Sequence, residues 1–176
     1  QRARAIWLTG LPGSGKTTIA MGLEKKLAMT GKITRVLDGD MVRNGINKDL
    51  GFSETDRTEN IRRIAEVNKL FNESGIITIN AFISPTCDIR EMARSIIGRD
   101  FFIEVFVYAS VEECIRRDPK GLYRKAFAGE IRNFTGVDAP YEIPRQPHLL
   151  INTEKTTEDE AVALLFGFIE RFILYS

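Results

Sequence analysis

The segment GLPGSGKT occupies residues 10–17 and fits the pattern G-x-x-x-x-G-K-[ST]. It follows a short β-rich run, IWLT, and precedes apolar residues at helical spacing, which are Ile19, Leu23 and Leu27. A strand, a glycine-rich turn and a helix in this order are the context in which the pattern forms a phosphate-binding loop, or P-loop. The sequence therefore predicts a site for a nucleoside triphosphate at the start of an α/β fold.

The residue types in this loop match the chemistry of phosphate binding. Glycines let backbone N–H groups converge on phosphate oxygens, and the N-terminus of the following helix supplies a positive potential. Lys16 is expected to bridge the phosphates, and the Thr17 hydroxyl is expected to bind Mg²⁺. We expect the nucleotide to be bound by Gly10, Gly13, Ser14, Gly15, Lys16, Thr17 and Thr18.

A P-loop by itself does not separate kinases from GTPases or motor ATPases. A GTPase would carry the guanine-binding motif N-K-x-D after a late strand. The nearest string, NKDL at residues 47–50, has its aspartate in the third place and precedes any late strand. The sequence therefore argues against a GTPase.

Length, charge and cysteine content limit the possible classes. The chain has 176 residues, 43% of them hydrophobic, and a net charge of +1. We expect one domain over residues 1–176. Neither a nucleic-acid nor a membrane-surface partner is expected, because both need a broad basic face. Cys87 and Cys114 are too few and too far apart for a disulfide framework or a zinc site. With no secretory or membrane-spanning run visible, we expect a cytoplasmic protein.

Short β-rich runs alternate with helical segments along the whole chain. The runs are IWLT, ITRVL, IITIN, FFIEVFVY and HLLIN. This alternation predicts an α/β fold with a central parallel sheet of about five strands flanked by helices. Gly31 and Gly75 mark expected helix C-caps, while Thr157 and Glu160 form a predicted capping box for a final helix through Phe172.

Residues 118–147 interrupt this alternation. The segment carries prolines and glycines among lysines and arginines, with little periodicity. Loops longer than ~12–15 residues are in most cases functional or disordered. We interpret the segment as a mobile basic lid that closes over a ligand, and the alternative is a flexible loop in solvent.

Asp38 and Asp40, in the string LDGD, follow the second predicted strand. Open α/β sheets bind ligands at the carboxyl ends of their strands. Phosphoryl transfer needs a carboxylate near Mg²⁺ and often a second one to orient or deprotonate the attacking hydroxyl. The pair can supply both groups, although aspartate and glycine also favour a simple turn.

The string FSETDRTENIRR, residues 52–63, predicts a helix that begins after Ser53. At ~100° per residue, Arg57 and Asn60 lie on the same side as the apolar residues of this helix. An inward cation needs an anion as a partner, so Arg57 indicates an anionic ligand unless its side chain reaches out to solvent. Arg62 and Arg63 point elsewhere and are expected in solvent or in surface salt bridges. Phe52 fits a hydrophobic staple, or a clamp on a planar ring together with Phe134 of the lid.

Further strings follow GLPGSGKTT in a fixed order: LDGDMVR, DLGFSETDRTENIRR, AFISP, DPKGLY and FTGVDAPYE. Together they closely resemble the adenylyl-sulfate kinase (APS kinase) family of P-loop kinases, from Trp7 to the final helix. The resemblance implies transfer of the γ-phosphate of ATP to the 3′-hydroxyl of adenylyl sulfate (APS). The products would be 3′-phosphoadenylyl sulfate (PAPS) and ADP, with Mg²⁺ as cofactor, in sulfate assimilation.

The resemblance also implies roles for residues that bind the second substrate. Arg43, Arg57 and Asn60 would hold the phosphosulfate, and Phe52 and Phe134 would sandwich the substrate adenine. Further contacts with adenylyl sulfate are expected from Ile83, Ser84, Lys120, Gly121 and Leu122.

The expected catalytic residues are Lys16, Asp38 and Asp40. By the same resemblance, Asp40 would activate the 3′-hydroxyl and Asp38 would bind Mg²⁺ through a water, although these roles could be exchanged. Arg117 would lie on the ATP side. His148, the only histidine, is expected to be structural.

Two alternatives remain open from the sequence. One is another small-molecule P-loop kinase, acting on a nucleotide or a gluconate-like acid, because it would share the P-loop, the acidic pair and a basic lid. The other is a non-catalytic PAPS-sensing domain, against which the intact Gly15-Lys16-Thr17 and both aspartates speak. The resemblance also implies a homodimer, and it allows fusion to, or cooperation with, an ATP sulfurylase.

Overall fold

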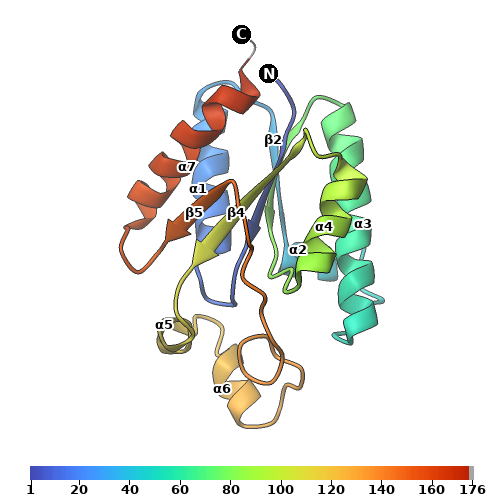
Figure 1. Cartoon of the computed structure of the whole chain (residues 1–176), viewed down its shortest axis with the longest axis vertical. Helices are drawn as coiled ribbons and strands as arrows, with labels where there is room; N and C mark the ends of the chain where they lie inside the picture. The colour runs from blue at the N-terminus through green and yellow to red at the C-terminus, as the bar shows by residue number, and fades with distance from the viewer. Residues whose placement is uncertain (175–176) are drawn as a thin grey trace.

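A parallel five-stranded sheet forms the centre of the computed structural model, which describes residues 1–174 (Figure 1). The strands are β1 (Ala5–Thr9), β2 (Thr34–Asp38), β3 (Ile77–Ala81), β4 (Phe102–Tyr108) and β5 (Leu149–Asn152), in the order β2-β3-β1-β4-β5. Each strand falls on one of the β-rich runs, so the predicted α/β class and parallel sheet are confirmed. The order reverses at β1, because β2 and β3 lie on one side of it and β4 and β5 on the other.

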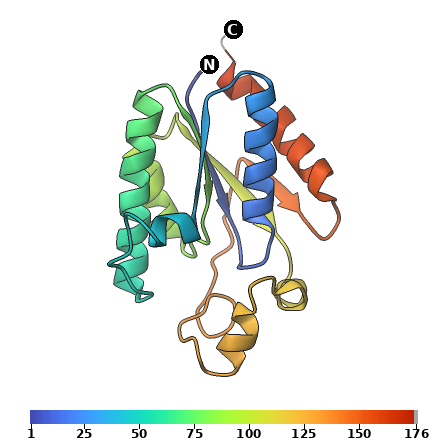
Figure 2. The same ribbon diagram turned by 180° about the vertical axis from the view of Figure 1, so that it is seen from behind.

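Two helical layers cover the sheet (Figures 1 and 2). On one face, α1 (Lys16–Met29) and α7 (Glu158–Ile173) pack over an aliphatic core that includes Ile6, Leu23 and Leu165. On the other face, α3 (Glu54–Glu73) and α4 (Cys87–Ile97) enclose a second core around Trp7. Both faces of the sheet are therefore buried, which explains why its strands read as apolar runs rather than as alternating patterns.

The helix boundaries follow local capping chemistry. The Thr157 hydroxyl accepts a bond from the Glu160 backbone N–H, and the Glu160 carboxylate reaches back, so the predicted capping box begins α7. Ser53 caps α3 as predicted, accepting from the backbone N–H of Asp56. Gly31 and Gly75 follow the last cap residues of α1 and α3 by one position, at φ 74° and 81°. They end these helices in the left-handed conformation that glycine adopts without strain.

The lid segment is more regular than the sequence indicated. It follows α5 (Val111–Arg117) and contains a short helix, α6 (Leu122–Phe127), beyond the carboxyl ends of the strands (Figures 1 and 2). A small core joins the lid to the rest of the fold, because Tyr123 and Phe134 pack with Leu11 of the P-loop and Cys114 of α5. Aromatic side chains anchor the segment, and its mobility and its closure over a ligand stay predictions. Within residues 1–174, no helix combines the length and hydropathy needed to cross a bilayer.

Candidate active site

A cavity of about 1170 Å³ lies between the P-loop, the short helix α2 (Gly39–Arg43), the start of α3 and the lid. Nearly all predicted site residues line this cavity: Gly13, Gly15, Lys16, Thr17, Thr18, Asp38, Asp40, Arg43, Phe52, Arg57, Asn60, Ile83, Ser84, Arg117, Lys120, Leu122 and Phe134. The cavity lies at the carboxyl ends of the strands, beyond the end of β1, where the strand order reverses. Open α/β sheets bind ligands at this position. Gly10, Ser14 and Gly121 are not among the lining residues.

Gly10 and Ser14 instead support the P-loop from behind. A Cβ on Gly10 would lie 2.3 Å from the backbone oxygen of Val107, so only glycine lets the loop pack this closely against β4. The Ser14 side chain is buried, and its hydroxyl lies 3.4 Å from the ammonium group of Lys16. These two residues therefore shape the loop that presents the lining residues.

Lys16 is held inside the P-loop. Its ammonium donates to the backbone oxygens of Gly10 at 2.9 Å and Leu11 at 2.7 Å, and the residue is 8% exposed. Burial lowers the pKa of Lys16 to about 7, and the nearby charge of Lys120 acts in the same direction. A phosphate beside the ammonium would oppose this shift, so the position suits a group that pairs with anionic oxygen.

Arg117, at the end of α5, connects this helix to the segment after β5 and, through Thr153, to the P-loop. Its guanidinium donates to the Thr153 hydroxyl at 2.9 Å and the Thr153 backbone oxygen at 3.0 Å, and it pairs with Glu113 at 2.7 Å. The Thr153 hydroxyl in turn donates to the backbone oxygen of Ser14 at 2.9 Å. Sequence reasoning missed Thr153, because a single threonine after a strand carries no motif.

The acidic pair lies at the end of β2. The Asp38 carboxylate accepts a bond from the backbone N–H of Met41 at 2.9 Å and caps α2. Asp38 thus both caps a helix and lines the cavity, and its functional role stays a prediction. Asp40 is exposed and forms an ion pair with Lys120 of the lid.

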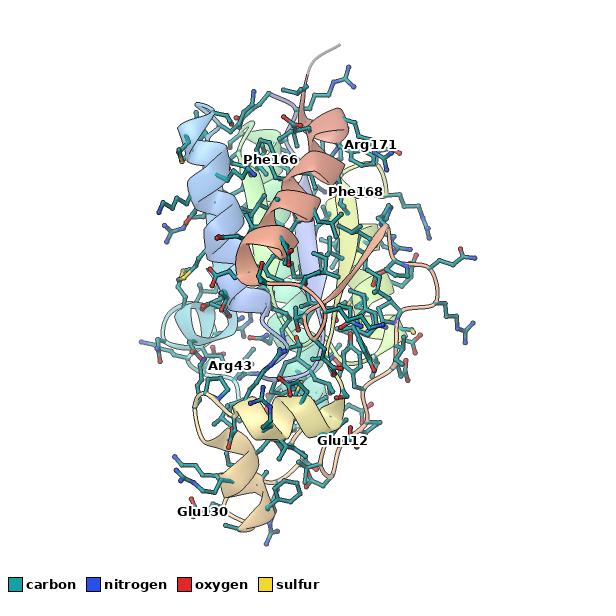
Figure 3. All side chains as sticks on the ribbon, turned by 90° about the vertical axis from the view of Figure 1, so that its left-hand side faces the viewer. Arg43, Glu112, Glu130, Phe166, Phe168 and Arg171 are labelled. Atoms are coloured by element: carbon teal, nitrogen blue, oxygen red, sulfur yellow. The ribbon has the colours of Figure 1, made fainter. Side chains whose placement is uncertain are left out.

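Arg43 and Phe52 form one wall of the cavity. The guanidinium of Arg43 lies 4.2 Å from the centre of the Phe52 ring and donates to the backbone oxygens of Leu50 and Gly51, at 3.3 and 2.9 Å. Figure 3 shows Arg43 at the end of the molecule where α5 and the lid lie. Phe52 lines the cavity and is 60% exposed, so it is not a hydrophobic staple buried in the fold.

Arg57 extends from α3 to the lid, and its pairing with an anionic ligand stays a prediction. Its guanidinium donates to the Thr135 hydroxyl at 3.2 Å and to the backbone oxygen of Asn133. Burial lowers the pKa of Arg57, and the nearby Asp138 opposes this. Asn60 is buried one turn further along, where its amide oxygen accepts from the Asn47 side chain at 2.9 Å. This contact uses the oxygen of the Asn60 amide and not its N–H groups.

Phe134 is anchored on the lid side of the same cavity. It is 8% exposed and meets the Tyr123 ring edge to face, with ring centres 5.0 Å apart. The Tyr123 hydroxyl donates to the backbone oxygen of Pro12 at 2.8 Å, so the lid contacts the P-loop directly. Sequence reasoning also missed Tyr123 as a site residue, although its place at the end of DPKGLY was the available signal.

The oxygen ligands in the cavity fit a magnesium ion carried by a nucleotide. Mg²⁺ keeps several waters and takes one or two protein oxygens together with substrate phosphates. Thr17 offers a hydroxyl and Asp38 a carboxylate, both hard oxygen donors in the cavity lining. Within the part of the chain that the structure describes, no cluster of three or more His, Cys, Asp or Glu side chains could hold a metal by itself. The donor set therefore suits an ion that arrives with phosphate.

Three residues that the sequence assigned to structure lie outside this cavity. The Nδ1 atom of His148 accepts from the backbone N–H of Glu104 at 3.0 Å, which confirms a structural histidine. Arg62 and Arg63 both pair with Glu59, at 2.7 and 2.9 Å, which confirms the predicted salt-bridged surface. Cys87 and Cys114 are free thiols.

Comparison with known proteins agrees with this geometry. The Adenylylsulphate kinase family matches residues 2–152. An adenylyl-sulfate kinase of Bacteroides thetaiotaomicron is 60% identical over 169 residues, which are 96% of this chain and 84% of the relative. The bifunctional enzyme NodQ of Rhizobium tropici is 58% identical over 153 residues, which are 87% of this chain and 24% of the relative.

A solved structure has a fold similar to that of this chain. The APS kinase CysC of Mycobacterium tuberculosis, in complex with AMPPNP and APS, superimposes with a TM-score of 0.92 at 44% identity. The match covers 96% of this chain and 98% of that one. Family match, high identity over nearly the whole chain and a common fold lead to one conclusion: this chain belongs to the adenylyl-sulfate kinase family.

Proposed function

We propose that this chain is an adenylyl-sulfate kinase, which transfers the γ-phosphate of ATP to the 3′-hydroxyl of adenylyl sulfate and releases PAPS and ADP. The observation that carries the proposal is the composition of one cavity. The cavity is lined by Lys16 and Thr17 from the start of α1, by Asp40 and Arg43 from α2, and by Arg57 from α3. A phosphate donor and a second, anionic acceptor can therefore occupy the same cavity.

The donor half is assigned to ATP. Backbone N–H groups of the P-loop and the N-terminus of α1 would bind its phosphates, and Lys16 would neutralise charge that moves between the β- and γ-phosphates. Arg117 would keep the end of β5 against the P-loop through Thr153. Positioning and charge stabilisation are the main protein contributions to phosphoryl transfer.

Mg²⁺ is the cofactor in this proposal. Thr17 and Asp38 are the residues that would hold it, Asp38 through a water. Bound with ATP, the ion supplies charge neutralisation for the transferred phosphoryl group. Asp38 already has a fixed carboxylate, because one of its oxygens accepts from the backbone of α2.

The acceptor half is assigned to adenylyl sulfate. Arg43 and Arg57 would pair with the phosphosulfate, and Asn60 would donate its amide N–H, because its oxygen already accepts from Asn47. Phe52 and Phe134 would hold the adenine from opposite sides. Both rings line the cavity, and each is supported by a neighbour: Phe52 by Arg43 and Phe134 by Tyr123.

Asp40 is assigned as the group that accepts the proton of the 3′-hydroxyl. Lys120 of the lid pairs with Asp40 and would turn to the substrate phosphates when they bind. The exchange of roles between Asp38 and Asp40 is the alternative within the same site. Ile83, Ser84 and Leu122 complete the proposed acceptor pocket.

Assembly and location stay predictions. A homodimer is expected from the family resemblance. Fusion to, or cooperation with, an ATP sulfurylase is likewise expected from the family resemblance, and the match to 24% of a bifunctional relative is consistent with fusion to a further domain. A cytoplasmic location and a single domain are expected from the sequence.

A coupled ADP-release assay tests the activity. The acceptors are adenylyl sulfate, AMP, CMP and gluconate, and mass spectrometry of the products identifies the phosphorylated compound. We expect rapid ADP release with adenylyl sulfate alone and a product heavier by one phosphate on its 3′-oxygen. Faster turnover with CMP or gluconate would replace this proposal with another small-molecule kinase, and no turnover with any acceptor would favour a non-catalytic domain.

A further inference from the structure

Arg90 of α4 connects three segments that meet behind the acceptor half of the cavity. Its Nη1 donates to the backbone oxygen of Ser84 at 2.7 Å, its Nη2 donates to the backbone oxygen of Glu142 at 2.7 Å, and its Nε pairs with Glu104 at 3.0 Å. Ser84 belongs to the turn after β3, Glu142 to the end of the lid segment, and Glu104 to β4. Arg90 itself does not line the cavity.

The turn that Arg90 contacts has a conformation that needs support. Ser84 has φ 39°, in the left-handed region that residues other than glycine rarely adopt. Around it, Trp7 donates to the Ser84 hydroxyl at 3.1 Å, and Thr9 donates to the backbone oxygen of Ile83 at 2.7 Å. Such a conformation persists only where its surroundings fix it, and residues of this kind concentrate at functional sites.

The same guanidinium fixes the end of the lid segment. The backbone N–H of Glu142 donates to the Pro85 oxygen at 2.7 Å, and the Glu142 carboxylate accepts from the backbone N–H of Cys87 at 2.6 Å. Next to it, the Tyr141 hydroxyl lies 2.9 Å from the Thr9 hydroxyl. Arg90 therefore lies where the turn and the lid end are joined, and it bonds to both.

The ion pair between Arg90 and Glu104 is buried in the fold and does not lie on the surface. Arg90 is 3% exposed and Glu104 5% exposed, so neither charge is solvated in the fold. Arg94, one turn later, also pairs with Glu104 at 3.0 Å, but its side chain is 23% exposed and its second partner is Glu91 of the same helix. Both arginines share one carboxylate, but only Arg90 also donates to the two carbonyl oxygens of Ser84 and Glu142.

We infer that Arg90 is a positioning residue for the acceptor: it fixes the turn at Ile83 and Ser84 and ties the end of the lid to it, so that the pocket is formed before the acceptor binds. The inference rests on the proposed function, since the pocket is the one assigned to adenylyl sulfate. Arg90 touches no substrate in this account and acts through the backbone of Ser84 and Glu142. Loss of the two hydrogen bonds from its guanidinium to Ser84 and Glu142 should therefore raise KM for the acceptor much more than KM for ATP.

The test compares Arg90→Lys with Arg94→Lys. Lysine keeps the charge beside Glu104 but cannot donate to two carbonyls in the guanidinium geometry. We expect Arg90→Lys to raise KM for adenylyl sulfate by ~10-fold or more, because small misplacements of a positioned group have effects of this size. KM for ATP should change by less than about twofold, and Arg94→Lys should leave both constants within about twofold of wild type.

A second variant guards against loss of folding. Arg90→Gln combined with Glu104→Gln removes both buried charges together, and Arg94, which also loses Glu104, keeps Glu91 as its partner. It should show the same selective rise in KM for adenylyl sulfate, with a melting curve that is cooperative. Unchanged KM for adenylyl sulfate in a folded variant, or equal rises in the KM of both substrates, would overturn the inference. Wild type in the same assay separates the two claims, because failure of wild type to use adenylyl sulfate contradicts the proposed function instead.

Discussion

Lys120 of the lid forms an ion pair with Asp40, the second residue of α2. Both side chains are more than half exposed, so a pair of this kind contributes only ~0–1 kcal/mol to stability. It can therefore be exchanged for contacts with a substrate at little cost. The proposed base and a lid cation thus meet in the cavity lining, and the position of the lid and the environment of Asp40 are connected.

Replacement of Lys120 tests this connection. Lys120→Ala should lower kcat/KM for adenylyl sulfate by ~10-fold or more, because a charge-assisted contact is worth roughly 1.5–3 kcal/mol. Lys125→Ala is the matched control, since Lys125 is a lysine of α6 that does not line the cavity. Steady-state kinetics of both variants give the comparison. Equal effects of the two substitutions would show that only the general charge of the lid matters.

Substitution of each aspartate should show which one is the base and which one binds a water of the Mg²⁺ ion. Asp40→Asn keeps the shape but removes the charge that polarises the hydroxyl, so kcat should fall by ~10²–10⁴. Asp38→Asn should act mainly through the concentration of Mg²⁺ needed for half-maximal rate. Titrations of Mg²⁺ with both variants measure the difference. If Asp38→Asn loses turnover while Asp40→Asn keeps it at saturating Mg²⁺, the two roles are exchanged.

Phe52 and Arg57 should contribute differently to acceptor binding. Phe52→Ala removes the phenyl ring that is proposed to stack on the adenine. The substitution should weaken the binding of adenylyl sulfate and of AMP alike, by ~1–3 kcal/mol. Arg57→Ala should weaken adenylyl sulfate at least as much, because the phosphosulfate loses its cation, and should affect AMP less. The preference for adenylyl sulfate over AMP should therefore narrow in the arginine variant only. Kinetics with both acceptors decide this, and a preference that narrows equally in both variants would refute the assignment.

His148 predicts an acid-sensitive fold. Burial, assisted by the charge of Arg94, lowers the pKa of His148 below its ordinary value of 6.5. The unfolded chain therefore binds a proton at His148 more tightly than the folded chain does. The contribution of His148 to the free energy of unfolding is fully present above pH 6.5 and is lost as the pH drops from 6.5 toward the lowered pKa. His148→Asn keeps an acceptor for the Glu104 backbone but does not titrate. Urea unfolding between about pH 7.5 and 5.5 should show a smaller decrease in the variant, and parallel curves would contradict the assignment.

The sequence predicted the features that local rules control. The five strands, the cap at Ser53, the capping box at Thr157 and the P-loop all depend on residues within a few positions of each other. Local order in the lid was not predicted, because α6 is too short to show periodicity and is held by the distant contact from Tyr123 to Pro12.

Within the site, the sequence supplied residue types but not partners. The helical position of Arg57 predicted its inward direction, yet its contact with Thr135 joins residues far apart in the chain. Arg90 carried no signal at all, because an arginine on an amphipathic helix is ordinarily solvated. Its burial depends on Glu104 in β4, which only the folded chain brings next to α4.

The activity itself is tested most directly by the ratio of kcat/KM for adenylyl sulfate to kcat/KM for AMP, measured with the unaltered chain, ATP and Mg²⁺. AMP keeps the adenine, ribose and phosphate but lacks the sulfate, so only the cations assigned to the phosphosulfate distinguish the two acceptors. The account predicts a ratio of at least ~10 to 10², which is the effect expected from removing one charge-assisted interaction. A ratio of one or less would contradict it and would identify the chain as a nucleotide kinase.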